Sequence, residues 1–135
     1  MTIPIGHLQY NIRPENAAFY RDLLVHLGWE VLHEGGGQLG CGSGNGQSLW
    51  FSPATSAAAA DHDAPGLNHL AFAAASMDDV EDLHGWLKRA GIATLYDTPR
   101  HRPEFASRDG DTYYQIMFTS PDGILFEMVY IGPMK

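Results

Sequence analysis

The stretch HLQYNI at residues 7–12 returns in a related form as HLAFAA at residues 69–74. Each copy is followed by a segment whose apolar residues have helical spacing, and the two segments stop at Gly28 and Gly91. The two histidines are 62 positions apart and the two glycines are 63 positions apart. Similar residues in the same order at one offset predict a duplicated module of about 60 residues.

Each module is expected to be a strand, a helix and then further strands. In the first module, strands are predicted over residues 4–12, 29–34 and 47–52, with a helix from Pro14 to Gly28. In the second, a strand around His69 and a helix between Ser76 and Gly91 precede predicted strands near 93–97, 112–119 and 124–131. Two βαβββ modules make an α+β protein in which each helix covers one face of its sheet.

A chain of 135 residues fits a single domain, 1–135, that contains both modules. We place module 1 at residues 1–52 and module 2 at residues 66–135. The segment between them, 53–65, is rich in Ala, Ser, Asp and Pro and lacks apolar periodicity. These features predict a linker.

The composition narrows the class of protein. Hydrophobic residues make up 44% and charged residues 18%, which is typical of a globular chain. The net charge of -8 argues against binding to nucleic acid or to an anionic membrane. No apolar run approaches the roughly 20 residues that span a bilayer, and the first residues do not resemble a signal peptide. With Cys41 as its one cysteine, the chain is expected to be cytoplasmic.

Three side chains suggest a metal site. If each helix covers the more apolar face of its first strand, His7 and His69 project from equivalent uncovered faces. Glu127 alternates with apolar residues in the last predicted strand, and a buried carboxylate needs a cation or a donor. Two imidazoles and one carboxylate are the ligand set of a facial metal triad. The alternative is that the histidines are ordinary packed residues and that Glu127 pairs with an arginine.

The turn SPDG at residues 120–123 joins the last two strands. With a two-residue turn at its centre, Glu127 lies opposite Ile116. Tyr114 then falls on the face of Glu127, one diagonal away. We therefore expect Tyr114 to donate a hydrogen bond to a substrate.

Arg100, His101 and Arg102 form the one compact basic cluster of the sequence. One interpretation is a solvated loop. The other is a gate that binds an anionic substrate and supplies His101 as a catalytic acid–base.

The glycine-rich segment 35–46 contains GGGQLG, which fits the letters of the dinucleotide-binding fingerprint. That fingerprint requires a helix after the glycines, whereas a strand is predicted here, so no nucleotide site is expected. The segment is predicted to be a mobile hairpin loop that acts as a lid. Cys41 lies in it without an obvious base and is interpreted as an ordinary thiol.

Three segments resemble the vicinal oxygen chelate superfamily, which includes glyoxalase I, bleomycin-resistance proteins, extradiol dioxygenases and fosfomycin-resistance thiol transferases. The resemblance covers nearly the whole chain, and its third segment is the most specific. The segments are GHLQYNI with FYRDLLVHLGWEVL (6–12 and 19–32), GLNHLAFAA (66–74) and YYQIMFTSPDGILFEMVY (113–130).

The resemblance implies paired βαβββ modules whose curled mixed sheets surround a metal cavity. It implies that His7, His69 and Glu127 occupy three ligand positions for a divalent ion: Fe, Mn, Zn or Ni. It also implies a homodimer, because family members often dimerise. Glyoxalase I has a fourth ligand on the last strand of its first module, where this chain places Trp50 or Phe51.

The predicted function is a metal-dependent enzyme of the glyoxalase, bleomycin-resistance and dioxygenase type, acting on a small oxygenated substrate. Lyase, isomerase, transferase and dioxygenase reactions are all compatible with the ligand set. The alternative is a non-catalytic protein, similar to the bleomycin-resistance proteins, that binds a drug or metabolite.

Overall fold

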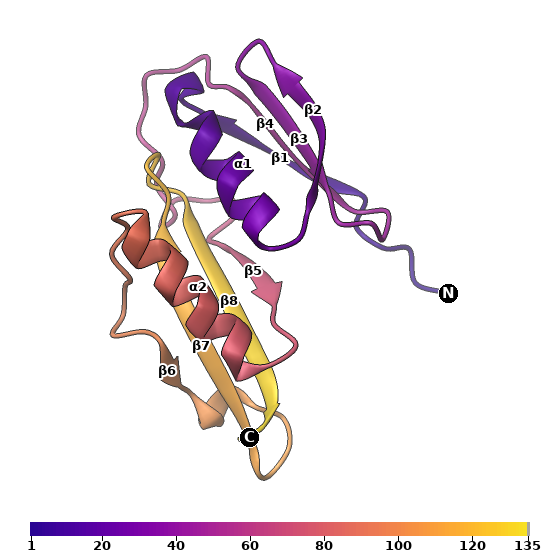
Figure 1. Ribbon diagram of the computed structural model, residues 1–135, viewed down its shortest axis with the longest axis vertical. Helices are drawn as coiled ribbons and strands as arrows, with labels where there is room; N and C mark the ends of the chain where they lie inside the picture. The colour runs from indigo at the N-terminus through magenta and orange to yellow at the C-terminus, as the bar shows by residue number, and fades with distance from the viewer. Residues whose placement is uncertain (135) are drawn as a thin grey trace. The chain divides into compact units, whose positions relative to one another are not determined.

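The computed structural model describes residues 1–134 and divides the chain into two compact units, with the boundary after Ala59. Within the described residues, each unit has one four-stranded sheet and one α-helix (Figure 1). The strand order is β1-β4-β3-β2 in unit 1 and β5-β8-β7-β6 in unit 2. The first strand of each unit thus pairs with the last, which confirms the predicted α+β fold of two modules.

The strands and the α-helix follow the same order in both units, whereas the 3-10 turn differs in position. Unit 1 contains β1 (His7–Ile12), a 3-10 turn (Pro14–Asn16), α1 (Ala17–His26), β2 (Glu30–Gly35), β3 (Gln38–Gly42) and β4 (Ser48–Pro53). Unit 2 contains β5 (Leu70–Ala73), α2 (Met77–Arg89), β6 (Arg100–His101), a 3-10 turn (Pro103–Phe105), β7 (Asp111–Thr119) and β8 (Leu125–Pro133). The first and last strands of each unit pair in parallel and the other neighbours pair antiparallel, so both sheets are mixed.

The core of unit 1 lies between α1 and one face of the sheet. The helix buries the stripe that its spacing predicts, with Tyr20, Leu23 and Leu24 inside. The ring of Phe51, from β4, stacks on Tyr20 at 4.6 Å and on Tyr10 at 5.4 Å between centroids. These contacts fix the apolar face of the sheet under α1, and they leave the opposite face, which we call the free face of unit 1, to polar residues.

The core of unit 2 repeats this arrangement. Ser76 caps α2 by accepting a hydrogen bond from the backbone N–H of Asp79, and the Asp79 carboxylate accepts one from the N–H of Ala75. This reciprocal capping confirms the predicted start of the helix. The side chains that α2 buries are Val80, Leu83 and Leu87. Phe118 and Phe126 are also buried and stack on each other, so they belong to the same core.

The prediction of a mobile loop over residues 35–46 is wrong. Strand β3 runs through the middle of this segment and pairs with both β2 and β4. Leu39 and Cys41 are fully buried. Burial, with a smaller contribution from the charge of Glu34, raises the pKa of the Cys41 thiol. A buried thiol of this kind is a poor nucleophile, in line with its interpretation as an ordinary cysteine.

The predicted strand at 93–97 is also wrong. This segment makes one isolated bridge, between Thr94 and Phe118, and the strand that pairs with the edge of β7 opposite β8 is β6. The reason is Thr98, whose hydroxyl donates to the carbonyl of Leu95 and accepts from the N–H of Met117. Because the hydroxyl takes a bond that a strand backbone would have made, the chain turns here and pairing resumes later.

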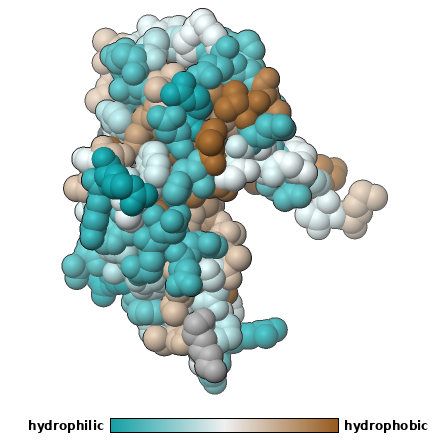
Figure 2. All heavy atoms as spheres, in the orientation of Figure 1, coloured by the Kyte–Doolittle hydropathy of each residue, from teal (hydrophilic) through white to brown (hydrophobic). Residues whose placement is uncertain are grey.

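Apolar side chains are exposed at several places in the described part of the chain. In Figure 2 the atoms over α2 are mostly hydrophilic, whereas apolar atoms gather beside β2, where Val31 and Leu32 are exposed. The residues before β1 extend away from the sheet of unit 1 toward Met1 (Figure 1). No helix in the described part of the chain is long and apolar enough to cross a membrane.

Candidate functional site

A polar cluster lies on the face of the second sheet that α2 does not cover, which we call the free face of unit 2. Along β8, Phe126 points to the core under α2, and its neighbour Glu127 therefore points to the opposite face. Ala71 of β5 pairs with Glu127 across the two strands. His69 lies two residues before Ala71, so its side chain reaches the same face.

His69 and Glu127 are in direct contact. Nε2 of the imidazole lies 2.9 Å from Oε1 of the carboxylate. The Glu127 side chain is 2% exposed and the His69 side chain is 33% exposed. The pair thus combines a buried carboxylate with an imidazole that retains access to the surroundings.

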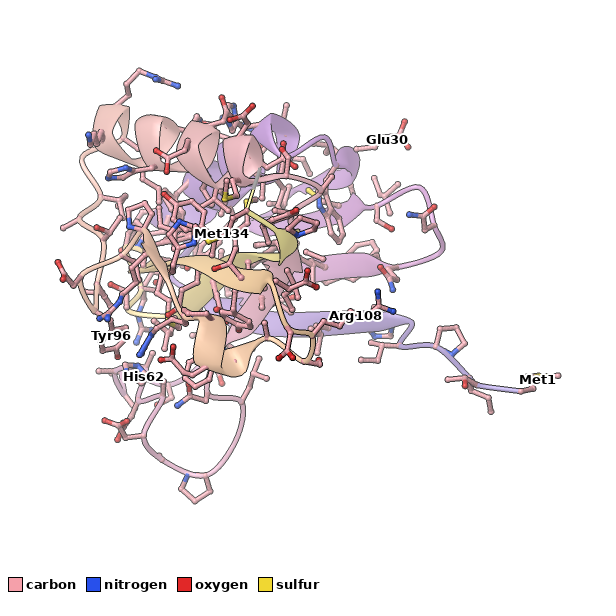
Figure 3. The ribbon with its side chains drawn as sticks, turned by 90° about the horizontal axis from the view of Figure 1, so that it is seen from below. Met1, Glu30, His62, Tyr96, Arg108 and Met134 are labelled. Atoms are coloured by element: carbon pink, nitrogen blue, oxygen red, sulfur yellow. The ribbon has the colours of Figure 1, made fainter. Side chains whose placement is uncertain are left out.

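Asn68 fixes the orientation of the His69 ring. Its amide nitrogen donates to the backbone carbonyl of His62, in the loop that leads into β5 (Figure 3). Its amide oxygen therefore faces Nδ1 of His69, at 2.7 Å. An amide oxygen can only accept, so Nδ1 carries the hydrogen. In neutral imidazole this leaves a lone pair on Nε2, which is the nitrogen that faces Glu127.

The second oxygen of Glu127 is held by two donors from β7. The Tyr113 hydroxyl donates to Oε2 at 2.9 Å and the Gln115 amide donates to the same oxygen at 2.6 Å. These bonds offset the cost of burying the carboxylate. Burial, together with the hydrogen bond to Glu127 and the charge of Glu127, raises the pKa of Tyr113 to about 12. The phenol is therefore a stable donor at neutral pH.

Arg102 is connected to the cluster through Gln115. Its Nε donates to the Gln115 side-chain oxygen at 3.4 Å, and its guanidinium lies 5.0 Å from the centre of the Phe105 ring. It also forms an ion pair with Glu104 at 3.7 Å. One residue of the predicted basic cluster therefore lies beside the carboxylate site.

The predicted position of Tyr114 is wrong, because the register of β7 and β8 differs by one residue from the expected one. Glu127 lies opposite Met117, not Ile116. The turn has three central residues, since Ser120 N–H donates to the carbonyl of Ile124 and Gly123 takes the left-handed conformation at φ 80°. A shift of one residue moves every side chain of a strand to the other face.

As a result, Tyr114 points toward α2 and donates to the Glu81 carboxylate. Tyr113 takes the position beside Glu127 that was predicted for Tyr114. Sequence analysis missed both Tyr113 and Gln115. The length of the SPDG turn was the only signal that could have found them, because a three-residue loop with glycine at its end gives the observed register.

His101 shares the side of Tyr114. It pairs with Tyr114 across β6 and β7, with 4.4 Å between the ring centres, and its Nδ1 lies 2.8 Å from the Thr112 hydroxyl. The structure therefore places His101 on the face opposite Glu127, and it does not bring the two predicted catalytic residues to the carboxylate.

His7 lies on the free face of unit 1, at the start of β1, where it pairs with Ser48 of β4. Two residues further along β4, Trp50 pairs with Gln9 and faces the same side. Phe51 faces the core. Of the two residues that the sequence places near the fourth ligand position of glyoxalase I, Trp50 shares the face of His7 and Phe51 does not. Within residues 1–134, no three His, Cys, Asp and Glu side chains form a group that could hold a metal ion.

Comparison with solved structures agrees with this fold. A glyoxalase-related protein from Bacillus halodurans is 27% identical with a TM-score of 0.78, and the match covers 93% of this chain and 94% of that chain. A glyoxalase family protein from Enterococcus faecalis is 25% identical with a TM-score of 0.64, covering 93% and 96%. A glyoxalase/dioxygenase from Nostoc punctiforme, 17% identical with a TM-score of 0.72 and covering 96% and 91%, shows the same fold.

A search of curated protein sequences gives no match. The family model of the Glyoxalase/Bleomycin resistance protein/Dioxygenase superfamily matches residues 7–128, a range that covers most of both units, from β1 through β7 and into β8. The chain therefore belongs to the glyoxalase/bleomycin resistance protein/dioxygenase superfamily.

Proposed function

We propose that this chain is a metal-dependent enzyme acting on a small oxygenated substrate, with His7, His69 and Glu127 as ligands of a divalent ion. The observation that carries the proposal is the 2.9 Å contact between Nε2 of His69 and Oε1 of Glu127. Membership of a superfamily that includes glyoxalases and dioxygenases supports the same reading.

The His69–Glu127 pair fits a divalent metal. Because Asn68 holds the hydrogen on Nδ1, a neutral His69 would direct its Nε2 lone pair at a carboxylate oxygen. Two electron-pair donors in contact repel each other unless they share a proton or a metal ion. Imidazole nitrogen and carboxylate oxygen are both ligands of divalent ions such as zinc, so this pair would supply two ligands from one face of the sheet.

The chain's own residues hold this donor set in place. When bound, a divalent ion would polarise a substrate oxygen and stabilise negative charge that develops on it. Tyr113 and Gln115 occupy Oε2 of Glu127 and so direct Oε1 toward His69. Asn68 fixes the ring orientation and the hydrogen position of His69. Partners of this kind orient metal ligands in many proteins.

Elemental analysis of protein purified without added metal tests the proposal. We expect about one equivalent of a divalent transition metal per chain, because folded ligand sets of this type retain their ion. The metal should be lost in His7→Ala and in His69→Ala. A metal-free protein whose melting temperature is unchanged by a chelator would overturn the proposal. A small molecule that raises the melting temperature without turnover would then identify a binding protein instead.

The two adjacent tyrosines offer a matched pair of variants. Tyr113→Phe removes a hydrogen bond to Glu127, and we expect metal affinity to fall about 10-fold, the lower end of the range for such partners. Tyr114→Phe makes the same chemical change on the opposite face and should leave metal affinity unchanged. Competition with a chromogenic chelator measures both. An equal effect of the two substitutions would contradict the assignment of Tyr113.

A further inference from the structure

The hairpin loop between β3 and β4 carries a reactive pair of residues that the proposed metal site does not use. The chain has four asparagines, and only Asn45 is followed by a glycine. The backbone nitrogen of the residue after an asparagine can attack the side-chain amide, which makes asparagine a thermolabile residue. A side chain on that following residue obstructs the attack. Gly46 has no Cβ atom, so its nitrogen is not shielded in this way.

The loop leaves both reacting groups accessible. Asn45 and Gly46 are exposed. The loop is closed by the Ser43 N–H, which donates to the carbonyl of Gln47 at 2.9 Å, and the Asn45 N–H donates to the Ser43 hydroxyl at 3.1 Å. Within residues 1–134, neither the Asn45 side-chain amide nor the Gly46 N–H has a hydrogen-bond partner. The attacking nitrogen and its target carbon can therefore approach each other without breaking a hydrogen bond.

Related positions in the chain are better protected. The Asn68 amide is held by its bond to the His62 carbonyl and by its contact with Nδ1 of His69. The two Asp-Gly pairs, 109–110 and 122–123, present carboxylates, which are poor electrophiles because they carry a negative charge. In the second pair the glycine N–H is also occupied, since it donates to a backbone carbonyl at 2.8 Å. Accessibility and chemical reactivity thus coincide at Asn45.

We propose that Asn45 is a site of spontaneous modification, at which the asparagine converts to aspartate and isoaspartate. The Gly46 nitrogen forms a bond to Cγ of Asn45. Its proton goes to the amide nitrogen, which leaves as ammonia, and a five-membered succinimide ring remains. Water then opens the ring. Attack at Cγ gives aspartate, and attack at the backbone carbonyl carbon gives isoaspartate. Water is the only co-reactant.

The modification changes the charge and the backbone of the loop. Either product adds one negative charge to a chain whose net charge is -8. Isoaspartate also inserts an extra carbon atom into the main chain between Ser43 and Gln47, the two residues that close the loop. The modification is independent of the proposed function, because no step involves a metal ion or a residue of the His69–Glu127 cluster.

The test compares conversion in the folded and the unfolded chain. Full-length protein is incubated in mildly alkaline buffer with and without guanidinium chloride, and peptide mapping by mass spectrometry locates the converted residue. Labelling by an isoaspartate methyltransferase is the second probe. We expect the folded chain to convert at Asn45 within about 10-fold of the unfolded rate, which corresponds to an added barrier below about 1.4 kcal/mol. Asn45→Gln is the matched control. It must form a larger ring and should convert about 10-fold more slowly or less, a barrier difference of about 1.4 kcal/mol or more.

Three results would overturn the proposal. Intact Asn45 in the folded protein, with conversion in guanidinium chloride, would show that the loop protects the residue. Earlier conversion at Asn68 or at an Asp-Gly pair would place the reactive position elsewhere. Acidic isoforms that accumulate equally fast in Asn45→Gln and in the unsubstituted chain would exclude Asn45 as their source. Conversion confined to Asn45 in the folded protein, with isoaspartate among the products, supports the proposal.

Discussion

Glu127→Gln is expected to remove the metal from the protein while leaving the fold intact. In the substituted chain, the amide oxygen can keep the hydrogen bonds from Tyr113 and Gln115, and the amide nitrogen can donate to the lone pair of His69. All buried groups of the cluster remain paired. The amide nitrogen is not a metal ligand and the negative charge is gone, so affinity should fall by about 100-fold or more, beyond the range for residues that only support a ligand.

Metal analysis and thermal denaturation of the same preparations check this result. The metal content should fall from about one equivalent to a small fraction, and the melting temperature should match that of the unsubstituted protein after chelation. Glu127→Leu is the matched control. It leaves the donors of Tyr113 and Gln115 without their acceptor and should cost a further 1–3 kcal/mol of stability, roughly. Full metal content in Glu127→Gln would show that this carboxylate is not a ligand.

Of the substitutions that we predict, Phe51→Ala is expected to lower the free energy of unfolding most. The side chain is 1% exposed and stacks on both Tyr20 and Tyr10. Its removal loses buried apolar area and leaves a cavity, for which about 3–5 kcal/mol is typical. This change should lower the melting temperature by roughly 10–20 °C for a chain of this size. Urea denaturation followed by circular dichroism measures the free energy of unfolding.

Phe105→Ala provides the comparison at an exposed position. This ring is 55% exposed, and its contacts are an edge-on approach to Tyr113 and the guanidinium of Arg102. We expect a loss below about 1 kcal/mol. Comparable losses in the two alanine variants would mean that Phe51 is not the centre of the unit 1 core.

Most of the fold could be predicted from the internal repeat. The offset between His7 and His69 predicted two equivalent modules, and the apolar stripes with their capping residues predicted both helices. These signals are local, since a helix face or a cap depends on residues within a few positions of one another. The alternation of each first strand likewise indicated which face its histidine occupies.

The elements that were mispredicted depend on contacts distant in sequence. The glycines of β3 predict a loop because glycine is typical of flexible segments, whereas in the structure Gly40 lets the Trp50 ring approach the backbone. The short strand β6 replaced the strand expected at 93–97, because the Thr98 side chain bonds to Met117 on another strand. Neither contact can be inferred from composition or periodicity.

For the candidate site, the sequence by itself determined that a histidine and a glutamate share the uncovered face of the second sheet. Only the tertiary structure decided which tyrosine joins them. The alternation of apolar and polar residues along a strand has a period of two, and it does not show which residue of the neighbouring strand lies opposite. One extra residue in the turn therefore places Tyr113, not Tyr114, on the face of Glu127. The free energy that selects this register comes from pairing and burial along all of β7 and β8, which no short stretch of sequence contains.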